Sequence, residues 1–264
     1  MAKEITTTKK NEMANAFFDD VAGTGFENTD NSDLVLSRIG ILQDLSPQIK
    51  KQNEKYLPEA ETGDFADLTL NKIVSKQGSN GFRFLPIIRT KTAIEWRPRT
   101  SGGGIESRTD ITPTRQFSAI AAEMKAVKTE GKSEWLLPSG NELIETWQFF
   151  GFSINDDLAP CFIPIKKGGL AAGRLWYDAM RKLKTPSGKQ ATMFYSTWDM
   201  DSVIKTTPGG DYWNFVIKQG PLLQELDNWE EIAGMAVEFQ KTYASGNFVA
   251  DIEEDTVDAD EQSM

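Results

Sequence analysis

The spacing of apolar and polar residues predicts a chain built mainly from strands. Residues 65–74 (FADLTLNKIV) alternate apolar and polar side chains with a period of two, which is typical of a half-buried strand. Dense apolar or aromatic side chains predict further strands in residues 34–45, 141–154 and 161–165. The last predicted strands, with a Pro-Gly-Gly-Asp turn between the second and the third, are residues 191–197, 202–207 and 212–218.

Residues 81–104 (GFRFLPIIRTKTAIEWRPRTSGGG) mix aromatic rings with cations. Their pattern predicts two strands joined by a short turn and closed by a glycine loop. Residues 78–81 (GSNG) supply a turn between the alternating segment 65–74 and this stretch. We therefore expect three consecutive strands to pair as an antiparallel meander.

Three segments have helical character. Residues 117–130 are rich in Ala, with apolar residues three and four positions apart. Residues 166–185 predict a loop and an amphipathic helix that ends at a Pro-Ser-Gly turn. Residues 222–244 show the clearest helical spacing, with Gly246 just past their end. The polar segment 48–64 is consistent with either a short helix or a surface loop.

The same pattern divides the chain into three parts. Residues 1–32 are polar and contain an Asn/Asp/Gly-rich patch, which predicts a flexible arm. Residues 249–264 are acidic and cannot bury apolar surface, which predicts a disordered tail. We expect residues 33–248 to form a single β-rich domain of the α+β class with a long C-terminal helix.

Composition excludes several enzyme classes. The chain has no histidine and a single cysteine, Cys161, so it can form neither a Ser-His-Asp triad nor a Cys/His zinc site. Residues 168–173 (GGLAAG) have the glycine spacing of a phosphate loop, but Arg-Leu follows where Lys and Ser or Thr are required. Asp199 and Asp201 alone are a weak metal site, and a solvated strand end explains them better. We predict a protein that is not an enzyme and uses no cofactor or metal.

The apolar runs also bear on localisation. None approaches the roughly 18 apolar residues that a membrane span requires, and the N-terminus lacks the apolar core of a signal peptide. A single cysteine suits a reducing compartment. We therefore expect a cytoplasmic protein that has no membrane partner.

Charge is distributed unevenly along the chain. The net charge is −10, which by itself argues against a nucleic-acid partner. Residues 71–190, however, carry 19 basic and 11 acidic side chains, a net charge of +8, whereas the segments on either side are net acidic. This difference in net charge between the segments indicates that residues 71–190 could bind a polyanion.

The net-basic part contains the residues that we expect to contact a single nucleic-acid strand. Such a strand is held by exposed rings that stack on its bases and by cations that bind its phosphates. In residues 81–104 the candidates are Phe82, Arg83, Arg89, Lys91, Trp96, Arg97 and Arg99. The alternative interpretation is a basic hairpin whose rings belong to the core, as we expect for Phe84.

A second group of candidates lies in and beside the helix predicted within residues 166–185. Its cations are Lys166, Lys167, Arg174, Arg181, Lys182 and Lys184. Helical spacing places Arg174, Asp178 and Arg181 on one face. Trp176 and Tyr177 are better explained as core residues than as a stacking surface.

A third candidate belongs to the aromatic group around the Pro-Gly-Gly turn. Alternation along a strand separates Tyr212 from Trp213 and Phe215. We expect Trp213 and Phe215 to face the interior, which leaves Tyr212 as a stacking platform.

The acidic tail is the most specific compositional feature. Its carboxylates are Asp251, Glu253, Glu254, Asp255, Asp258, Asp260 and Glu261. One interpretation is a solubilising end. The other is a segment that binds partner proteins and can fold back over a basic groove, where it would compete with other polyanions.

The order of several segments resembles a family of bacteriophage single-stranded DNA-binding proteins that occur with phage replication and recombination genes. The matching segments are RIGILQDLSP (38–47), GDF (63–65), FLPIIRTKTAIEWRPR (84–99) with GGG after it, PCFIPIKKGGLAAGRLWYDAMRKLKTP (160–186) and GDYWNFVIKQGPL (210–222). An acidic C-terminal tail completes the resemblance, which covers residues 34–264 and rests more on the order of elements than on any invariant motif.

This resemblance implies an OB-like antiparallel barrel with added helices. It also implies sequence-tolerant binding of single-stranded DNA in the cytoplasm of an infected bacterial cell. Assembly into a homo-oligomer is compatible with this role. The tail would then contact phage replication or recombination proteins. In some phages such proteins also act on host RNA polymerase.

Three hypotheses of function follow. The leading one is a phage-type protein that coats single-stranded DNA. The second is an interaction protein, such as an inhibitor or coactivator, which docks on a host enzyme through its acidic surface without binding DNA. The third is a structural component of the virion or its scaffold, which would form large assemblies.

Overall fold

The computed structural model describes residues 36–79, 81–129, 135–155, 158–207 and 210–244. The arm predicted for residues 1–32 and the tail predicted for residues 249–264 lie outside them. The described strands are β1 (Ser37–Ile41), β2 (Phe65–Asp67), β3 (Lys72–Ser75), β4 (Phe82–Trp96), β5 (Ile105–Asp110), β6 (Val127–Lys128), β7 (Trp135–Leu136), β8 (Glu142–Ser153), β9 (Ala159–Lys166), β10 (Ser196–Thr207) and β11 (Gly210–Leu222). The described α-helices are α2 (Phe117–Glu123), α3 (Leu170–Lys182) and α4 (Trp229–Ala244).

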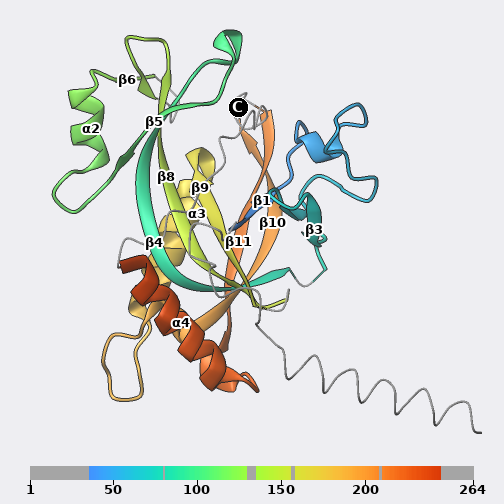
Figure 1. Ribbon diagram of the computed structural model, residues 1–264, viewed down its shortest axis with the longest axis vertical. Helices are drawn as coiled ribbons and strands as arrows, with labels where there is room; N and C mark the ends of the chain where they lie inside the picture. The colour runs from blue at the N-terminus through green and yellow to red at the C-terminus, as the bar shows by residue number, and fades with distance from the viewer. Residues whose placement is uncertain (1–35, 80, 130–134, 156–157, 208–209, 245–264) are drawn as a thin grey trace, which may run out of the picture.

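The strands form one strongly curled sheet (Figure 1). Its order is β11-β10-β4-β8-β9-β1-β2-β3, with β5 paired to β4, and with the β6–β7 pair joined to β8 through β7. The β1–β9 pair is parallel, and the other described pairs are antiparallel. The α+β, β-rich prediction is therefore confirmed, and the half-barrel formed by the sheet is consistent with an OB-like fold.

The prediction of two strands and a turn within residues 81–104 is wrong, because β4 is one strand of 15 residues. Pro86 lacks an N–H donor, but the chain does not reverse there. Instead, the pairing of β4 with β8 shifts register between Pro86 and Ile88, and such a bulge bends a strand without ending it. The expected meander is wrong too, since β4 pairs with β10, β8 and β5.

The single strand predicted for residues 65–74 is instead two short strands, β2 and β3. Asp67 Oδ1 accepts hydrogen bonds from the backbone N–H groups of Thr69 (3.0 Å) and Leu70 (2.9 Å). Asn71 then adopts a left-handed backbone with a φ of 51°. These local side-chain bonds reverse the chain, because a short polar side chain offers the backbone an alternative to a ladder.

The other predicted elements survive with changed boundaries. The helices predicted in residues 117–130 and 166–185 are confirmed as α2 and α3, and the segment 48–64 consists of turns after a short 3₁₀ helix (Pro47–Ile49). Residues 191–195 are not a strand, and β10 begins only at Ser196. The last helix begins at Trp229 because residues 223–225 form a separate 3₁₀ turn, where Glu225 Oε2 accepts a bond from the Leu222 N–H (2.9 Å).

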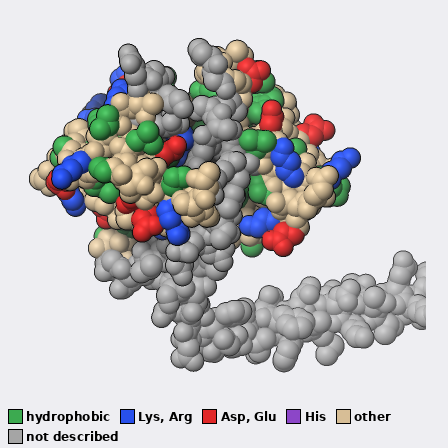
Figure 2. Space-filling model, turned by 90° about the horizontal axis from the view of Figure 1, so that it is seen from above, with side chains coloured by type: hydrophobic (Ala, Val, Ile, Leu, Met, Phe, Trp, Pro, Cys, Tyr) green, Lys and Arg blue, Asp and Glu red, His purple; other side chains and the backbone are tan. Residues whose placement is uncertain are grey.

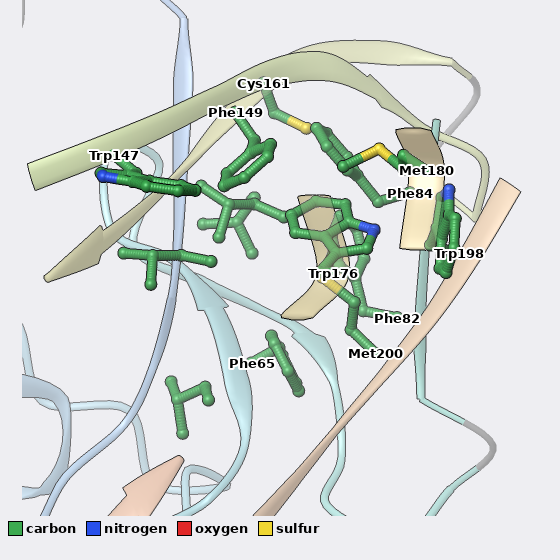
Figure 3. Packing of buried hydrophobic residues seen from close by; sticks show 14 residues of the cluster. Phe65, Phe82, Phe84, Trp147, Phe149, Cys161, Trp176, Met180, Trp198 and Met200 are labelled. Atoms are coloured by element: carbon green, nitrogen blue, oxygen red, sulfur yellow. The ribbon is translucent and has the colours of Figure 1, made fainter. Parts of the chain in front are cut away.

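Aromatic side chains fill the concave side of the sheet (Figure 3). Trp176 of α3 lies between Phe149 and Trp198, with ring centroids 4.1 Å and 6.2 Å away. Phe82 and Phe84 of β4 belong to the same cluster and are fully buried. Burial of each such side chain contributes roughly 1.5–3 kcal/mol, so Trp176 and Met180, the large buried side chains of α3, anchor the helix.

Helix α4 covers the opposite face of the sheet. Ile232 and Ala236 of α4 pack against Leu85, Ile87 and Phe152, which alternate with the residues that face α3. The two helices therefore lie on different sides of β4 and β8.

The side chain of Gln43 joins two segments that no backbone ladder connects. Its Oε1 accepts a hydrogen bond from the Trp213 N–H (2.8 Å), and its Nε2 donates to the Trp213 carbonyl (3.0 Å). Nearby, Ser202 Oγ donates to the carbonyl of Gly63 (2.6 Å). These bonds hold β10 and β11 against the loops that follow β1 and precede β2, which stabilises the curled shape.

Candidate nucleic-acid interface

Arg89 of β4 lies over the faces of two rings. Its guanidinium carbon is 3.7 Å from the ring centroid of Tyr177 on α3 and 4.7 Å from that of Trp147 on β8. Trp147 is directly opposite Lys91 in the β4–β8 pair. Because side chains two residues apart on a strand share a face, Arg89 and Lys91 both point toward α3.

Two further cations lie beside the Trp147 ring and a third lies near Arg89, and together with Arg89 they form what we call the Arg89 cluster: Arg89, Lys91, Arg174 and Arg181. Lys91 Nζ is 5.4 Å and the Arg174 guanidinium carbon 5.9 Å from the Trp147 ring centroid. Arg181 is exposed and lies two helical turns after Arg174, close enough to Arg89 for the two charges to repel. The cluster thus joins β4 and α3, which are far apart in the sequence.

Glu145 is the carboxylate that contacts this cluster. Its Oε1 accepts a hydrogen bond from Trp147 Nε1 (2.7 Å), and its Oε2 accepts one from Arg174 Nη2 (3.2 Å). These bonds fix the indole in place. Glu145 balances one of the four positive charges, and Asp178 on the same face of α3 pairs with Lys182, so the cluster stays net positive.

Burial lowers the pKa of Arg89, and the charge of Arg181 lowers it further, while Tyr177 and Glu145 oppose the shift. An arginine nevertheless stays protonated at physiological pH, so the position holds a charge that water solvates incompletely. The Arg89 Nε is buried and has no hydrogen-bond partner in the part of the chain that the structure describes. The guanidinium therefore carries a donor that the described protein atoms leave unsatisfied.

Several predicted cations outside the cluster pair with carboxylates other than Glu145. Arg83 Nε lies 2.6 Å from Asp199, and this hydrogen bond raises the pKa of Arg83. The corresponding pairs are Arg97 with Glu106 (3.3 Å), Lys167 with Glu142 (3.3 Å) and Lys182 with Asp178 (2.6 Å). Lys184 is exposed beyond the end of α3, and the Arg99 side chain lies outside the described part of the structure.

Lys166 lies on the other face of the sheet. It pairs with Thr146 in the β8–β9 ladder, whereas the next residue of β8, Trp147, faces the Arg89 cluster. Its Nζ is 4.8 Å from the ring centroid of Trp96. A single groove therefore cannot include both Lys166 and Arg89 on one face.

The rings predicted to stack on bases are mostly buried. Phe82 is 0% exposed and Trp96 is 6% exposed, so neither presents a free ring face, contrary to our expectation. Phe84 and Trp176 are core residues as predicted. The expectation fails for Phe82 and Trp96 because the strong curl of the sheet buries side chains on both faces of β4.

Around the Pro-Gly-Gly turn the outcome is mixed. Trp213 and Phe215 are partly buried and pack against the core cluster, as predicted. Tyr212 is half-buried, and its ring lies so close to Gly168 that a Cβ atom there would be 2.7 Å from the hydroxyl oxygen. It therefore covers the start of α3 and is only in part accessible.

Sequence reasoning missed the residues that organise the Arg89 cluster. Trp147 and Glu145 were only part of a predicted aromatic strand. Tyr177 packs against the core as predicted, but its contact with Arg89 was not foreseen. Glu145 and Trp147 are two residues apart on β8. This spacing was a usable signal, because it places an indole and a carboxylate on the same face of the strand. The partner element α3, however, could not be inferred from local spacing.

Charge on the face shown in Figure 2 is mixed. Lys and Arg side chains of the described residues are interspersed with Asp and Glu there, and no broad patch of one sign covers that face. The described residues therefore form no broad positive surface on this face.

Other kinds of site find little support in the described residues. Among them, no group of three or more Cys, Asp or Glu side chains is arranged to hold a metal ion. Asp199 binds Arg83, and Asp201 Oδ1 accepts a hydrogen bond from the Gly78 N–H (3.2 Å). None of the described helices is long and apolar enough to cross a membrane.

The curled sheet, with α3 packed on one face and α4 on the other, defines a β-rich α+β protein of half-barrel type. The family model described as Pam3 phage gp34-like protein matches residues 8–249, and the chain belongs to this family. It is therefore a bacteriophage protein. No curated protein and no solved structure shows a significant match to the chain.

Proposed function

We propose that this phage protein binds single-stranded DNA and that the Arg89 cluster holds phosphates of the strand. The observation that carries the proposal is the convergence of Arg89 and Lys91 from β4 with Arg174 from α3 around two rings, with Arg181 of α3 near Arg89. A groove that follows a nucleic-acid backbone needs several cations from separate elements. The cluster also lies in the net-basic residues 71–190 of an otherwise acidic chain.

The position of the cluster favours a strand over a small ion. Arg174 is exposed and Lys91 is half-buried, so the cations reach from a partly buried guanidinium to the surface. Successive phosphates could engage them one after another. Because the ring faces fix the Arg89 guanidinium, little side-chain freedom is lost when a phosphate binds.

The test compares two triple variants that lose the same charge. Arg89→Ala, Lys91→Ala and Arg174→Ala together should weaken binding of fluorescein-labelled oligo(dT) by about 100-fold, since each charged contact is worth roughly 1 kcal/mol. The matched control replaces Arg115, Lys205 and Lys241, three exposed cations outside the cluster, and should stay within about threefold of the wild type.

Equal losses in both triple variants would show that only total charge matters, which would refute the assigned site. If the wild-type protein itself does not bind oligo(dT), the proposed function is wrong. Docking on a host enzyme through acidic surfaces would then be the function to test.

We also propose that the acidic residues 251–264 recruit phage replication or recombination proteins and do not hold the DNA. These residues include seven carboxylates and no cation. Like charge repels phosphates, so direct DNA contact through this segment would be unfavourable.

A further inference from the structure

Proteins that bind single strands commonly stack bases on aromatic rings, but many rings of the described residues are used in another way. Phe82, Phe84, Trp176 and Trp198 are at most 3% exposed and pack with one another. Trp96 and Trp147 are each 6% exposed. A base cannot lie flat on a ring whose faces are covered by protein atoms.

In the Arg89 cluster, cations lie over the rings of Tyr177 and Trp147. Arg89 occupies a face of Tyr177 at 3.7 Å and also contacts the face of Trp147 at 4.7 Å. A base that stacked on the face of Tyr177 that Arg89 occupies would have to displace Arg89, and the binding site would lose its most central phosphate ligand. Ring stacking and phosphate binding therefore compete at this site.

The more exposed rings lie elsewhere. Trp229 is 41% exposed but begins α4, which packs on the face of β4 opposite Arg89. The alternation along β4 shows this directly, because Ile88 packs against the α4 side and the next residue, Arg89, points away from it. Tyr212 is half-buried against Gly168.

We infer that the Arg89 cluster recognises the sugar-phosphate backbone alone, without stacking on the bases of the strand. This inference rests on the proposed function and specifies its chemistry. Rings hold the cations in place, and the cations hold the phosphates. Binding then depends on strand length and salt but not on whether the nucleotides carry bases.

The experiment measures how well unlabelled oligo(dT) and an abasic strand of the same length, built from tetrahydrofuran nucleotides, displace fluorescein-labelled oligo(dT) from the full-length protein. The two competitors should have affinities within about threefold of each other. A single stacked base would instead favour oligo(dT) by roughly 5- to 150-fold.

Oligo(dT) binding with a large loss for the abasic strand would overturn the inference and leave the proposed function standing. Failure of both strands to bind would overturn the proposed function and the inference together. A Tyr212→Leu variant tests the remaining half-buried ring of the predicted interface. Unchanged oligo(dT) affinity supports backbone recognition, and a tenfold loss would contradict it.

Discussion

Arg89 combines two properties that a lysine could not supply at the same position. Its planar guanidinium lies over Tyr177 and Trp147, and such contacts contribute about 0.5–2 kcal/mol depending on how far water is excluded. The same group keeps N–H donors at its edge, which can bind a phosphate in a bidentate way. Lys91, at 5.4 Å from the Trp147 centroid, acts mainly as a point charge.

This difference predicts opposite outcomes for two charge-conserving substitutions. Arg89→Lys should weaken oligo(dT) binding about tenfold. A lysine ammonium cannot stack on the rings and lacks the planar pair of N–H donors that binds a phosphate in a bidentate way. Lys91→Arg should keep affinity within about twofold. Fluorescence anisotropy titrations at one salt concentration would measure both, and equal affinities for the two variants would contradict the role given to Arg89.

Gly151 and Gly234 make a second contrast at the residue scale. A Cβ atom at Gly151 would collide with the backbone carbonyl of Leu85 and lie 2.9 Å from the Phe84 ring, whereas at Gly234 of α4 it would meet open space. Gly151→Ala should therefore destabilise the protein by more than about 2 kcal/mol. Gly234→Ala should stabilise it by about 0.5–1 kcal/mol, because Ala is the better helix former. Urea unfolding of both variants checks the pair, and a neutral Gly151→Ala would show that β4 and β8 separate more easily than their contact implies.

Some residue environments were predictable and others were not. Phe84 and Trp176 could be assigned to the core from the density of apolar neighbours. Phe82 and Trp96 look similar in sequence to exposed stacking rings, because each lies next to an arginine. Their burial depends on the curl of the whole sheet, which local sequence does not encode.

At the element scale, the position of β4 decides the architecture. It pairs with β10 at one end, with β8 along most of its length and with β5 at the other end. The sequence predicted the strand character of this segment but not its continuity, since a proline usually interrupts a ladder. The opposite residue, Gly151, allows the bulged chain to approach closely, and a contact between residues 65 positions apart is invisible to a local pattern.

A substitution at Gln43 tests how the curled sheet is held closed. Replacement by Leu keeps the approximate volume but leaves the N–H and the carbonyl of Trp213 without their partner. We expect Gln43→Leu to lower the free energy of unfolding by about 1–3 kcal/mol. The exposed Gln52→Leu is the matched control and should change stability by less than about 0.5 kcal/mol. A similar small effect for both variants in urea unfolding would mean that water replaces the bonds of Gln43.

At the scale of the whole molecule, basic and acidic residues are separated more clearly along the sequence than over the face shown in Figure 2. The net-basic residues 71–190 include the four cations of the Arg89 cluster, and several other cations of this part are paired with carboxylates. The sequence therefore predicted where positive charge concentrates. Strand register and the packing of α3 determine which cations remain available to bind a phosphate. Only the structure could reveal these two features.

Removal of residues 251–264 tests the role proposed for the acidic tail. The truncated protein loses seven carboxylates and should bind oligo(dT) with unchanged or higher affinity, and any gain should shrink as salt is added. Parallel titrations of the full-length and truncated proteins measure this. A large loss of affinity on truncation would refute the view that this segment competes with DNA or leaves it untouched.

The salt dependence of oligo(dT) binding tests the central claim most directly. Four cations in the Arg89 cluster that each neutralise a phosphate should give a plot of log Kobs against log salt concentration with a slope of about −3, because a single strand releases roughly 0.7 counterion per neutralised phosphate. Emission from Trp147, which contacts three of these cations, should change in the same titration. A slope near zero, or no binding at low salt, would contradict the account.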